Sequence, residues 1–322
     1  MEPSEPSDED APRPAPLDFD AALERVARAG AADVLIQGES GAGKSHAAKR
    51  IHALSERSAG PFVVASVAGL ADSLLEAELF GHVAGAFTGA TEDRPGRFRR
   101  AHGGTLVLEA IDALALPLQV KLLRVLQERV VEPVGSSASV PVDVRVVATA
   151  TEDLARAARE GRFREDLFFR LAVVPLRVPP LRARAGGPDF AVLCRAALAA
   201  AAERSGLGVR PLAESALDRL RNHPWPGNLR ELENALERSL VLAGADTPEE
   251  ALQGADFDFL DEALGGAADE VARAALAHGV LLEDLERALF TQALDEERGN
   301  VAGAARRLGL TRKAFDYRRK RL

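Results

Sequence analysis

Short apolar runs alternate with helical patterns along the first half of the chain. Five runs have the length and the apolar content of buried strands: Val34–Ile36, Phe62–Val67, Thr105–Leu108, Val142–Ala148 and Val173–Val178. The segments between them have helical patterns, as connections between parallel strands do. This alternation predicts an α/β fold with a parallel sheet and crossover helices.

The second half of the chain has a helical pattern only. Residues from about Asp189 to Ala243 predict helices, and the segment Leu229–Leu242 within them is amphipathic. An acidic stretch rich in Ala and Gly separates this part from a last helical unit. The expected organisation is a disordered acidic and Pro-rich tail (1–16), an α/β domain (17–182), a helical domain (183–243), a linker (244–280) and a terminal helical domain (281–322).

Composition narrows the class of protein. The 322 residues are 47% hydrophobic and 28% charged, which is typical of a globular chain. Cys194 is the single cysteine, which excludes an internal disulfide and favours a reducing cytoplasm. No run of about 18 uncharged apolar residues occurs and the N-terminus is acidic, so we expect neither a membrane span nor a signal peptide.

A glycine-rich segment follows the first predicted strand and precedes a predicted helix. It consists of Gly38, Glu39, Ser40, Gly41, Ala42, Gly43, Lys44 and Ser45. Glycines at these positions let the backbone curl so that successive N–H groups point at phosphate oxygens. Lys44 adds a positive charge for the β- and γ-phosphates, and the Ser45 hydroxyl can join the ligands of Mg²⁺. The segment therefore predicts a binding site for a nucleoside triphosphate.

The charge distribution singles out the C-terminus. The net charge of −8 argues against nucleic-acid binding by the chain as a whole, but eight Lys or Arg residues against the single Asp316 follow Asn300. An acidic body with a basic tip indicates that only the tip meets a phosphate backbone.

The same tip has the features of a helix-turn-helix. Asn300 can cap a first helix, Gly309 supplies a turn, and Thr311 can cap a second helix. A recognition helix of this kind projects its N-terminal side chains to base edges and its flanks to phosphates. The expected DNA-binding residues are Thr311, Arg312, Lys313, Arg318 and Arg319. The alternative is a basic terminal helix that is merely solvated.

Two further segments resemble a known family. Glu78-Leu79-Phe80-Gly81-His82 is followed by Gly85, Ala86, Phe87, Thr88, Gly89 and Ala90. With the glycine-rich segment upstream, the chain from about residue 17 to residue 322 is similar to the AAA+ activators of sigma-54 RNA polymerase, the bacterial enhancer-binding proteins. In that family the loop that contacts sigma-54 reads GAFTGA. Its flanking glycines and apolar Phe suit a mobile tip that presses on a partner.

The resemblance implies a fold, ligands and partners. The fold would be an α/β AAA+ P-loop NTPase with a parallel sheet, an all-α lid subdomain and a C-terminal helix-turn-helix of the Fis type. The expected cofactors are ATP and Mg²⁺. The expected partners are enhancer-type DNA, sigma-54 RNA polymerase and further copies of the chain in a ring, most simply a hexamer.

The resemblance also assigns three arginines. Residues 163–171 are similar to the family's arginine-finger segment, so Arg164 and Arg170 would reach the nucleotide of a neighbouring subunit. The alternative is that both are surface arginines paired with Glu165 or Asp166. Residues 223–232 are similar to the sensor II region, in which Arg230 would face the phosphates. Trp225 in this region is expected in the core.

Three departures from the family pattern converge on water activation. The family has Asp and then Glu after the third predicted strand, whereas this chain has Glu109 and then Ala110. Glu109 can still help to hold Mg²⁺, but Ala110 cannot orient or deprotonate the attacking water. Ser66 and Thr151 stand where the family has asparagines.

Three functions remain open on the sequence. The first is a sigma-54-dependent regulator with slow hydrolysis, in which Glu109 or another acid replaces the missing carboxylate. The second is a nucleotide-binding, DNA-binding regulator that does not hydrolyse ATP and modulates active relatives. The third is a general AAA+ remodelling protein without a sigma partner.

Overall fold

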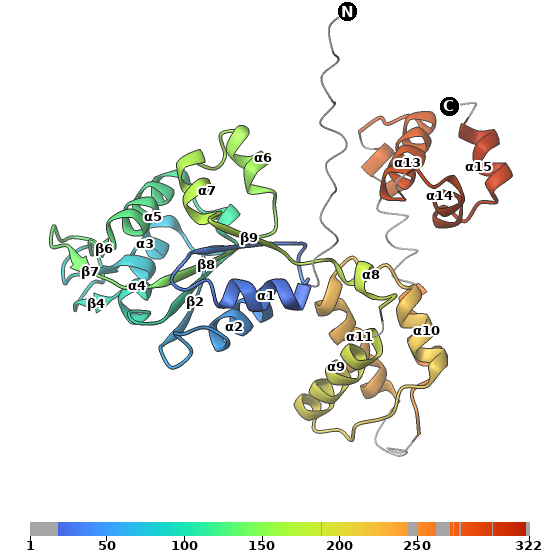
Figure 1. Ribbon diagram of the computed structural model, residues 1–322, viewed down its shortest axis with the longest axis horizontal. Coiled ribbons are helices and arrows are strands. Elements are labelled where there is room, and N and C mark those ends of the chain that lie inside the picture. The colour runs from blue at the N-terminus through green and yellow to red at the C-terminus, as the bar shows by residue number, and fades with distance from the viewer. Residues whose placement is uncertain are drawn as a thin grey trace, which may run out of the picture. The chain divides into compact units, whose positions relative to one another are not determined.

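The computed structural model describes residues 19–187, 189–243, 250–261, 271–272, 274–276, 278–297 and 299–319. The chain divides into two compact units, Met1–Leu252 and Gln253–Leu322 (Figure 1). The predicted tail of residues 1–16 and much of the predicted linker lie outside the described residues.

A parallel sheet forms the centre of the first unit. Its strands are β1 (Val34–Gln37), β2 (Phe62–Ser66), β5 (Thr105–Glu109), β8 (Arg145–Ala150) and β9 (Val174–Arg177). They lie in the order β2-β5-β8-β1-β9, and every neighbouring pair is parallel. Each strand overlaps one of the five apolar runs, so the predicted α/β fold is confirmed.

Helices and short two-residue strands connect these strands and build the rest of the described chain. In the first unit they are α1 (Phe19–Ala27), α2 (Lys44–Ala53), α3 (Asp72–Phe80), β3 (Gly81–His82), β4 (Arg94–Pro95), α4 (Arg97–Arg100), η2 (Ile111–Ala113), α5 (Leu116–Glu128), β6 (Val130–Val131), β7 (Val140–Pro141), α6 (Leu154–Arg159), α7 (Glu165–Leu171), α8 (Leu181–Arg184), α9 (Phe190–Ser205), α10 (Glu214–Asn222) and α11 (Asn228–Leu242). In the second unit they are η3 (Gly254–Phe257), α13 (Leu282–Glu296), α14 (Val301–Arg307) and α15 (Arg312–Arg319).

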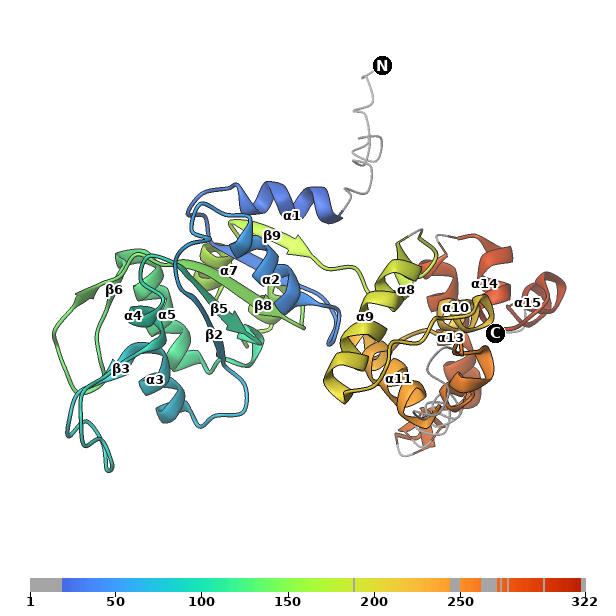
Figure 2. The same cartoon turned by 90° about the horizontal axis from the view of Figure 1, so that it is seen from below.

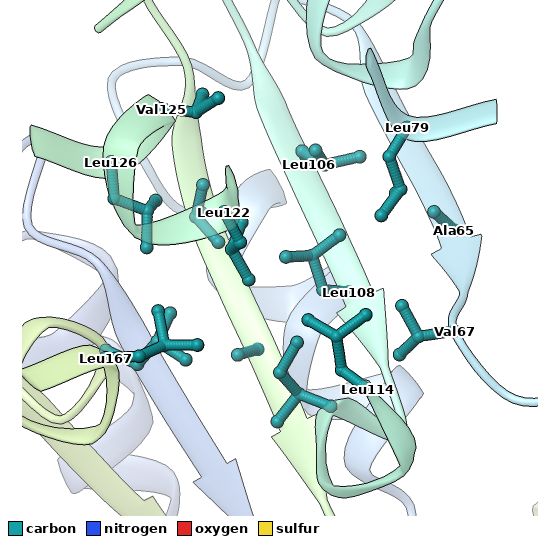
Figure 3. Packing of buried hydrophobic residues seen from close by; sticks show 14 of the residues in the cluster. Ala65, Val67, Leu79, Leu106, Leu108, Leu114, Leu122, Val125, Leu126 and Leu167 are labelled. Atoms are coloured by element: carbon teal, nitrogen blue, oxygen red, sulfur yellow. The ribbon is translucent and has the colours of Figure 1, made fainter. Parts of the chain in front are cut away.

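The two faces of the sheet are covered by different helices. Val34 and Ile36 of β1 pack with residues of α1 and α2, whereas Leu35 between them belongs to the cluster under α3, α5, α6 and α7. This alternation follows from the period of two along a strand. Figure 3 shows Leu106 and Leu108 of β5 in that second cluster, close to Leu122 of α5. Because both faces are buried, the strands can be apolar throughout.

A buried carboxylate lies directly before β1. Asp33 is 1% exposed, accepts a hydrogen bond from the Val146 N–H at 3.1 Å, and forms ion pairs with Arg129 at 3.4 Å and Arg170 at 3.1 Å. Burial raises the pKa of Asp33, and the neighbouring arginine charges oppose this increase. Arg145, fully buried nearby, donates to the backbone carbonyls of three residues near α1. These contacts fix the N-terminal end of β1 to α5 and α7.

The helices α8 to α11 form the predicted lid. Trp225 is fully buried and its indole N–H donates to the Leu220 carbonyl at 2.8 Å, so its expected place in the core is confirmed. Leu252 is also fully buried and forms a β-bridge with Leu212. The chain therefore returns to the lid after residue 243, where the sequence pattern placed the start of a linker.

The second unit contains the predicted helix-turn-helix. The Asn300 side chain accepts from the Gly303 N–H at 3.2 Å at the start of α14, and the Thr311 hydroxyl accepts from the Ala314 N–H at 3.3 Å at the start of α15. Gly309 between the helices has φ 66°, in the left-handed region. Phe315 of α15 is fully buried and stacks on Phe290 at 4.5 Å. Both predicted caps and the predicted turn are confirmed.

Among the described residues, no helix has the length and the apolar content that crossing a membrane requires.

The burial of Cys194 yields a first prediction. Cys194 belongs to α9 and its side chain is fully buried. Burial raises the pKa of the thiol to about 12 from an ordinary value of 9.0. At pH 8 this shift lowers the reactive thiolate fraction about 10³-fold. We expect Cys194 in the native protein to react with a disulfide reagent about 10³-fold more slowly than in guanidinium. The rate of reaction is measured by absorbance. Cys194→Ala is the blank, and fast labelling of native protein would contradict this packing.

Candidate nucleotide site

The candidate site lies at one edge of the sheet. β1 runs into the glycine-rich segment of residues 38–45, and β5 and β8 run toward Glu109 and Thr151. Ser66 at the end of β2 pairs in register with Glu109. Because the strands are parallel, their carboxyl ends meet at one edge, which is where ligands bind in open α/β sheets. The structure thus brings together the glycine-rich segment and the positions that depart from the family pattern.

The glycines of the segment are required by its backbone. Gly41 has φ 71° and Gly43 has φ 100°, both in the left-handed region. A Cβ atom on Gly41 would lie 2.2 Å from the Gly227 carbonyl oxygen. The helix α2 begins at Lys44, so its N-terminus and its unpaired N–H groups end the segment. This arrangement of a curled loop and a helix N-terminus fits a polyphosphate.

Lys44 lies at the centre of this segment. Its ammonium donates to the carbonyls of Gly38 at 2.8 Å and Glu39 at 2.9 Å, and to the Thr151 hydroxyl at 3.3 Å. Burial lowers the pKa of Lys44, and the Arg230 guanidinium lowers it further, while the carboxylates of Asp112 and Glu109 raise it. The charged groups that act on Lys44 are thus Asp112, Arg230 and Glu109.

A pair of oxygen donors lies beside Lys44. The Ser45 hydroxyl donates a short hydrogen bond to the Glu109 carboxylate. Hydroxyl and carboxylate oxygens are ligands that Mg²⁺ prefers, and this ion normally keeps waters and substrate phosphates as its other ligands. In the part of the chain that the structure describes, no group of three or more His, Cys, Asp or Glu could hold a metal ion by itself. The donor set therefore fits a Mg²⁺ ion that arrives with a phosphate ligand.

The lid closes over the glycine-rich segment through a polar contact that the sequence did not indicate. The Glu39 carboxylate accepts two hydrogen bonds from Arg182 at 2.5 and 2.8 Å and one from the Asn228 amide at 3.1 Å. The Arg182 hydrogen bond is the main cause that lowers the pKa of Glu39. The same Asn228 amide donates to the Ser40 carbonyl at 3.0 Å. We call Glu39, Arg182 and Asn228 the lid clamp.

A cavity of about 610 Å³ lies between the glycine-rich segment and the lid. Its walls include Phe19 and Leu23 of α1, Leu193 of α9 and Arg230 of α11. The size is in the range of small-molecule sites, with apolar walls on one side and the polar segment on the other. Arg230, predicted to face the phosphates, lines this cavity.

Ala110 lines the same cavity with a methyl group. Its backbone is in the left-handed region, with φ 57° and ψ 48°, and its N–H donates to the Thr149 hydroxyl at 3.3 Å. A non-glycine residue pays about 1–3 kcal/mol for this conformation, which is found mainly at functional sites. The Ser66 hydroxyl turns to the Ala68 carbonyl at 3.4 Å. Position 110 therefore combines a left-handed backbone with a side chain that carries no carboxylate.

The two candidate finger arginines lie in different surroundings. Arg164 is exposed and pairs with Asp166 at 2.7 Å, the partner that the alternative interpretation named. Arg170 is largely buried, donates to the Leu126 carbonyl at 2.9 Å and pairs with Asp33. The finger roles of both stay predictions. The Arg164 side chain is 42% exposed and that of Arg170 is 28% exposed.

The GAFTGA segment forms a tight loop between β3 and β4. Gly85 and Gly89 have φ 79° and 103°, and the Gly85 N–H donates to the Ala90 carbonyl at 2.8 Å. Phe87 is 39% exposed, with its ring 5.0 Å from that of His82 in an edge-to-face contact. Figure 2 shows the segment after β3 projecting from the α/β part. Phe87 is thus an apolar side chain of this loop that is partly exposed and partly packed against His82.

The predicted DNA-binding residues share one helix. Arg312 and Lys313 begin α15 and are exposed, as are Thr311, Arg318 and Arg319. Arg318 also pairs with Glu286 of α13 at 3.2 Å. Four exposed basic side chains with the capping Thr311 are thus present on the second helix of the helix-turn-helix.

Comparisons with known proteins agree with this geometry. Residues 16–177 match the sigma-54 interaction domain family, residues 184–257 match the AAA+ ATPase lid domain, and residues 281–322 match the Fis family of bacterial regulatory proteins.

Individual relatives of the chain are also transcriptional regulatory or response regulator proteins. The chain is 45% identical over 284 residues to the C4-dicarboxylate transport transcriptional regulatory protein DctD of Pseudomonas aeruginosa, and 44% identical over 294 residues to the response regulator protein PilR of the same organism. These alignments cover 88% and 90% of this chain, but only 58% of DctD and 64% of PilR.

A solved structure is similar as well. NtrX from Brucella abortus is 33% identical, with a TM-score of 0.68 over 94% of this chain and 66% of NtrX, and its complex with ATP is 34% identical with a TM-score of 0.66 over the same shares. The sheet, the lid and the helix-turn-helix, together with these matches, lead to one conclusion. The chain belongs to the family of sigma-54-dependent transcriptional regulators, with an AAA+ P-loop NTPase domain, its lid and a Fis-type helix-turn-helix.

Proposed function

We propose that this chain binds ATP with Mg²⁺ at the edge of the sheet and uses it to control a contact with sigma-54 RNA polymerase. The observation that carries the proposal is the arrangement around Lys44. The glycine-rich segment, the pair of Ser45 and Glu109, and Arg230 of the lid all border one cavity. The complex of the similar NtrX with ATP supports the choice of nucleotide.

Each group has a task in holding the nucleotide. The N–H groups of the segment and the N-terminus of α2 bind phosphate oxygens, and Lys44 neutralises the β- and γ-phosphates. Ser45 and Glu109 would hold a Mg²⁺ ion, which would supply positive charge to offset the charge that develops on the phosphates. Arg230 and the lid clamp couple occupation of the site to the position of the lid.

Hydrolysis in this chain is slow. A positioned general base typically contributes about 10²–10⁴-fold to a rate, and position 110 supplies none. Ser66 and Thr151 replace the asparagines expected nearby, so the network that orients the attacking water is altered as well. The intact GAFTGA loop favours a protein that still turns over ATP, because a remodelling loop needs a cycle to move it.

A second candidate function follows from Ala110. A chain that binds ATP without hydrolysing it would act as a nucleotide-dependent DNA-binding regulator and would modulate rings formed with active relatives. The methyl group at position 110 is the observation that favours it.

The remaining parts of the proposal concern partners. Phe87 and Thr88 contact sigma-54, and α15 binds enhancer-type DNA through Arg312, Lys313 and the basic residues that follow. Arg164 reaches the nucleotide of a neighbouring copy in a ring, most simply a hexamer. The protein acts in the cytoplasm.

The first test concerns nucleotide binding. Lys44→Ala removes the charge that faces the β- and γ-phosphates, so we expect the dissociation constant for ATP with Mg²⁺ to rise about 10–100-fold. Isothermal titration calorimetry measures it. Lys49→Ala, a lysine on the same helix whose exposed side chain is outside the cavity, is the matched control. Equal affinity of the Lys44 variant and the unaltered protein would remove the proposal.

The second test decides between slow and absent hydrolysis. We expect unaltered protein to release phosphate from saturating ATP at a low but measurable rate, and Ala110→Glu to raise that rate about 10–100-fold by supplying a carboxylate. A coupled phosphate-release assay measures both. No release by the unaltered protein at saturating ATP would favour the second candidate function.

The third test concerns the sigma-54 contact. Phe87→Ala removes the exposed ring at the loop tip, and we expect the affinity for purified sigma-54 in the presence of ATP and Mg²⁺ to fall at least about tenfold, as for an aromatic anchor. Biolayer interferometry measures it, with ATP affinity unchanged. Val241→Ala, an exposed apolar side chain of the lid, is the control. Unchanged sigma-54 affinity of the Phe87 variant would refute the assigned contact.

A further inference from the structure

One carboxylate near the candidate nucleotide site, that of Asp112, has no role in the function proposed above. Asp112 lies in η2, two residues after Ala110, and is half-buried. Its oxygens accept from the Thr151 N–H at 3.4 Å and from the Glu152 N–H at 3.3 Å. These N–H groups belong to the residues that follow β8. Asp112 therefore lies at the carboxyl edge of the sheet, beside one of the positions that depart from the family pattern.

Asp112 is also connected to Lys44. The Thr151 hydroxyl lies 3.3 Å from the Lys44 ammonium, so one residue separates Asp112 from the lysine that binds phosphate. Among the charges that act on the pKa of Lys44, that of Asp112 is the largest and exceeds that of Glu109. Asp112 is therefore linked to Lys44 through Thr151, whose N–H donates to the Asp112 carboxylate and whose hydroxyl accepts from the Lys44 ammonium.

Glu109 is less suited to act on water. Its carboxylate already accepts the Ser45 hydroxyl, and this pair supplies the oxygen ligands for Mg²⁺. Ala110 has no ionisable group. Of the two carboxylates that act on Lys44, Asp112 is therefore the one that is not assigned as a ligand of Mg²⁺.

We propose that Asp112 is the catalytic carboxylate of this chain and holds the attacking water in place of the carboxylate missing at position 110. In the reaction, the water oxygen bonds to the γ-phosphorus while the bond from that phosphorus to the bridging oxygen of ADP breaks. One water proton passes to the Asp112 carboxylate and later returns to solvent or phosphate. This inference rests on the proposed binding of ATP.

The competing explanation is structural. Asp112 could serve only as an acceptor for the two N–H groups after β8. An asparagine retains an acceptor oxygen of the same reach but carries no charge and cannot take a proton at neutral pH. Asp112→Asn therefore separates the two explanations without deleting the hydrogen bonds.

The experiment compares four full-length proteins: unaltered, Asp112→Asn, Ala110→Glu and the double variant. We expect Asp112→Asn to lower the turnover number at least about tenfold, while the dissociation constant for ATP with Mg²⁺ changes less than about twofold. We also expect it to lose trapping of ADP with aluminium fluoride, measured as nucleotide retained after gel filtration, because that complex mimics the transferring phosphoryl group. Ala110→Glu should rescue the turnover of Asp112→Asn.

The control is Glu152→Gln, the next acid along the chain, whose carboxylate pairs with Arg162 at 2.6 Å on the surface. Turnover and fluoride trapping by Asp112→Asn equal to those of the unaltered protein would overturn the inference, as would ATP binding by unaltered protein with no phosphate release. In both cases the proposed ATP site stands. Absence of ATP binding by the unaltered protein would instead refute the proposed function itself.

Discussion

The close approach of two backbones holds the nucleotide site together. The Leu229 N–H donates to the Gly41 carbonyl at 3.0 Å, and the space beside the Gly41 Cα is taken by the Gly227 carbonyl oxygen. Any side chain at position 41 would push the lid away from the glycine-rich segment. Because Arg230 follows directly after this contact, its distance from Lys44 depends on it. Gly41 and Leu229 both line the cavity, and the lid clamp adds charged hydrogen bonds at the same junction.

Three carboxylates near the glycine-rich segment make different contacts. The Glu39 carboxylate accepts from Arg182 of the lid, the Glu109 carboxylate accepts from Ser45, and the Asp112 carboxylate accepts from the Thr151 N–H. Position 110 keeps a strained backbone although its side chain is only a methyl group. A carboxylate there would lie on the chain next to Glu109, whereas Asp112 approaches through a short helical turn. Under the proposal made above, the negative charge that acts on the water lies two residues further along the chain than position 110.

The sequence predicted what depends on local pattern. The five apolar runs became the five strands of the sheet, and Asn300, Gly309 and Thr311 form the expected caps and turn, because strand burial and capping are decided within a few residues. The lid clamp could not be predicted, since Arg182 and Glu39 are 143 residues apart along the chain and no local pattern pairs them. The same holds for Asp33 and its arginines. The sequence does show a carboxylate, Asp112, two positions after Ala110. The direction in which this side chain points depends on the helical turn η2, which the sequence pattern did not predict.

The ion pair between Asp33 and Arg170 has a mechanical consequence. Asp33 immediately precedes β1, whose other end enters the glycine-rich segment, and Arg170 lies on α7 only six positions after Arg164. Loss of the Arg170 contact would leave this buried carboxylate with Arg129 alone, and weakening the compensation of a buried charge costs free energy. A movement of α7 that breaks the Arg170–Asp33 pair therefore acts on the residue that directly precedes β1. The position of α7 is in this way coupled to the strand that leads into residues 38–45.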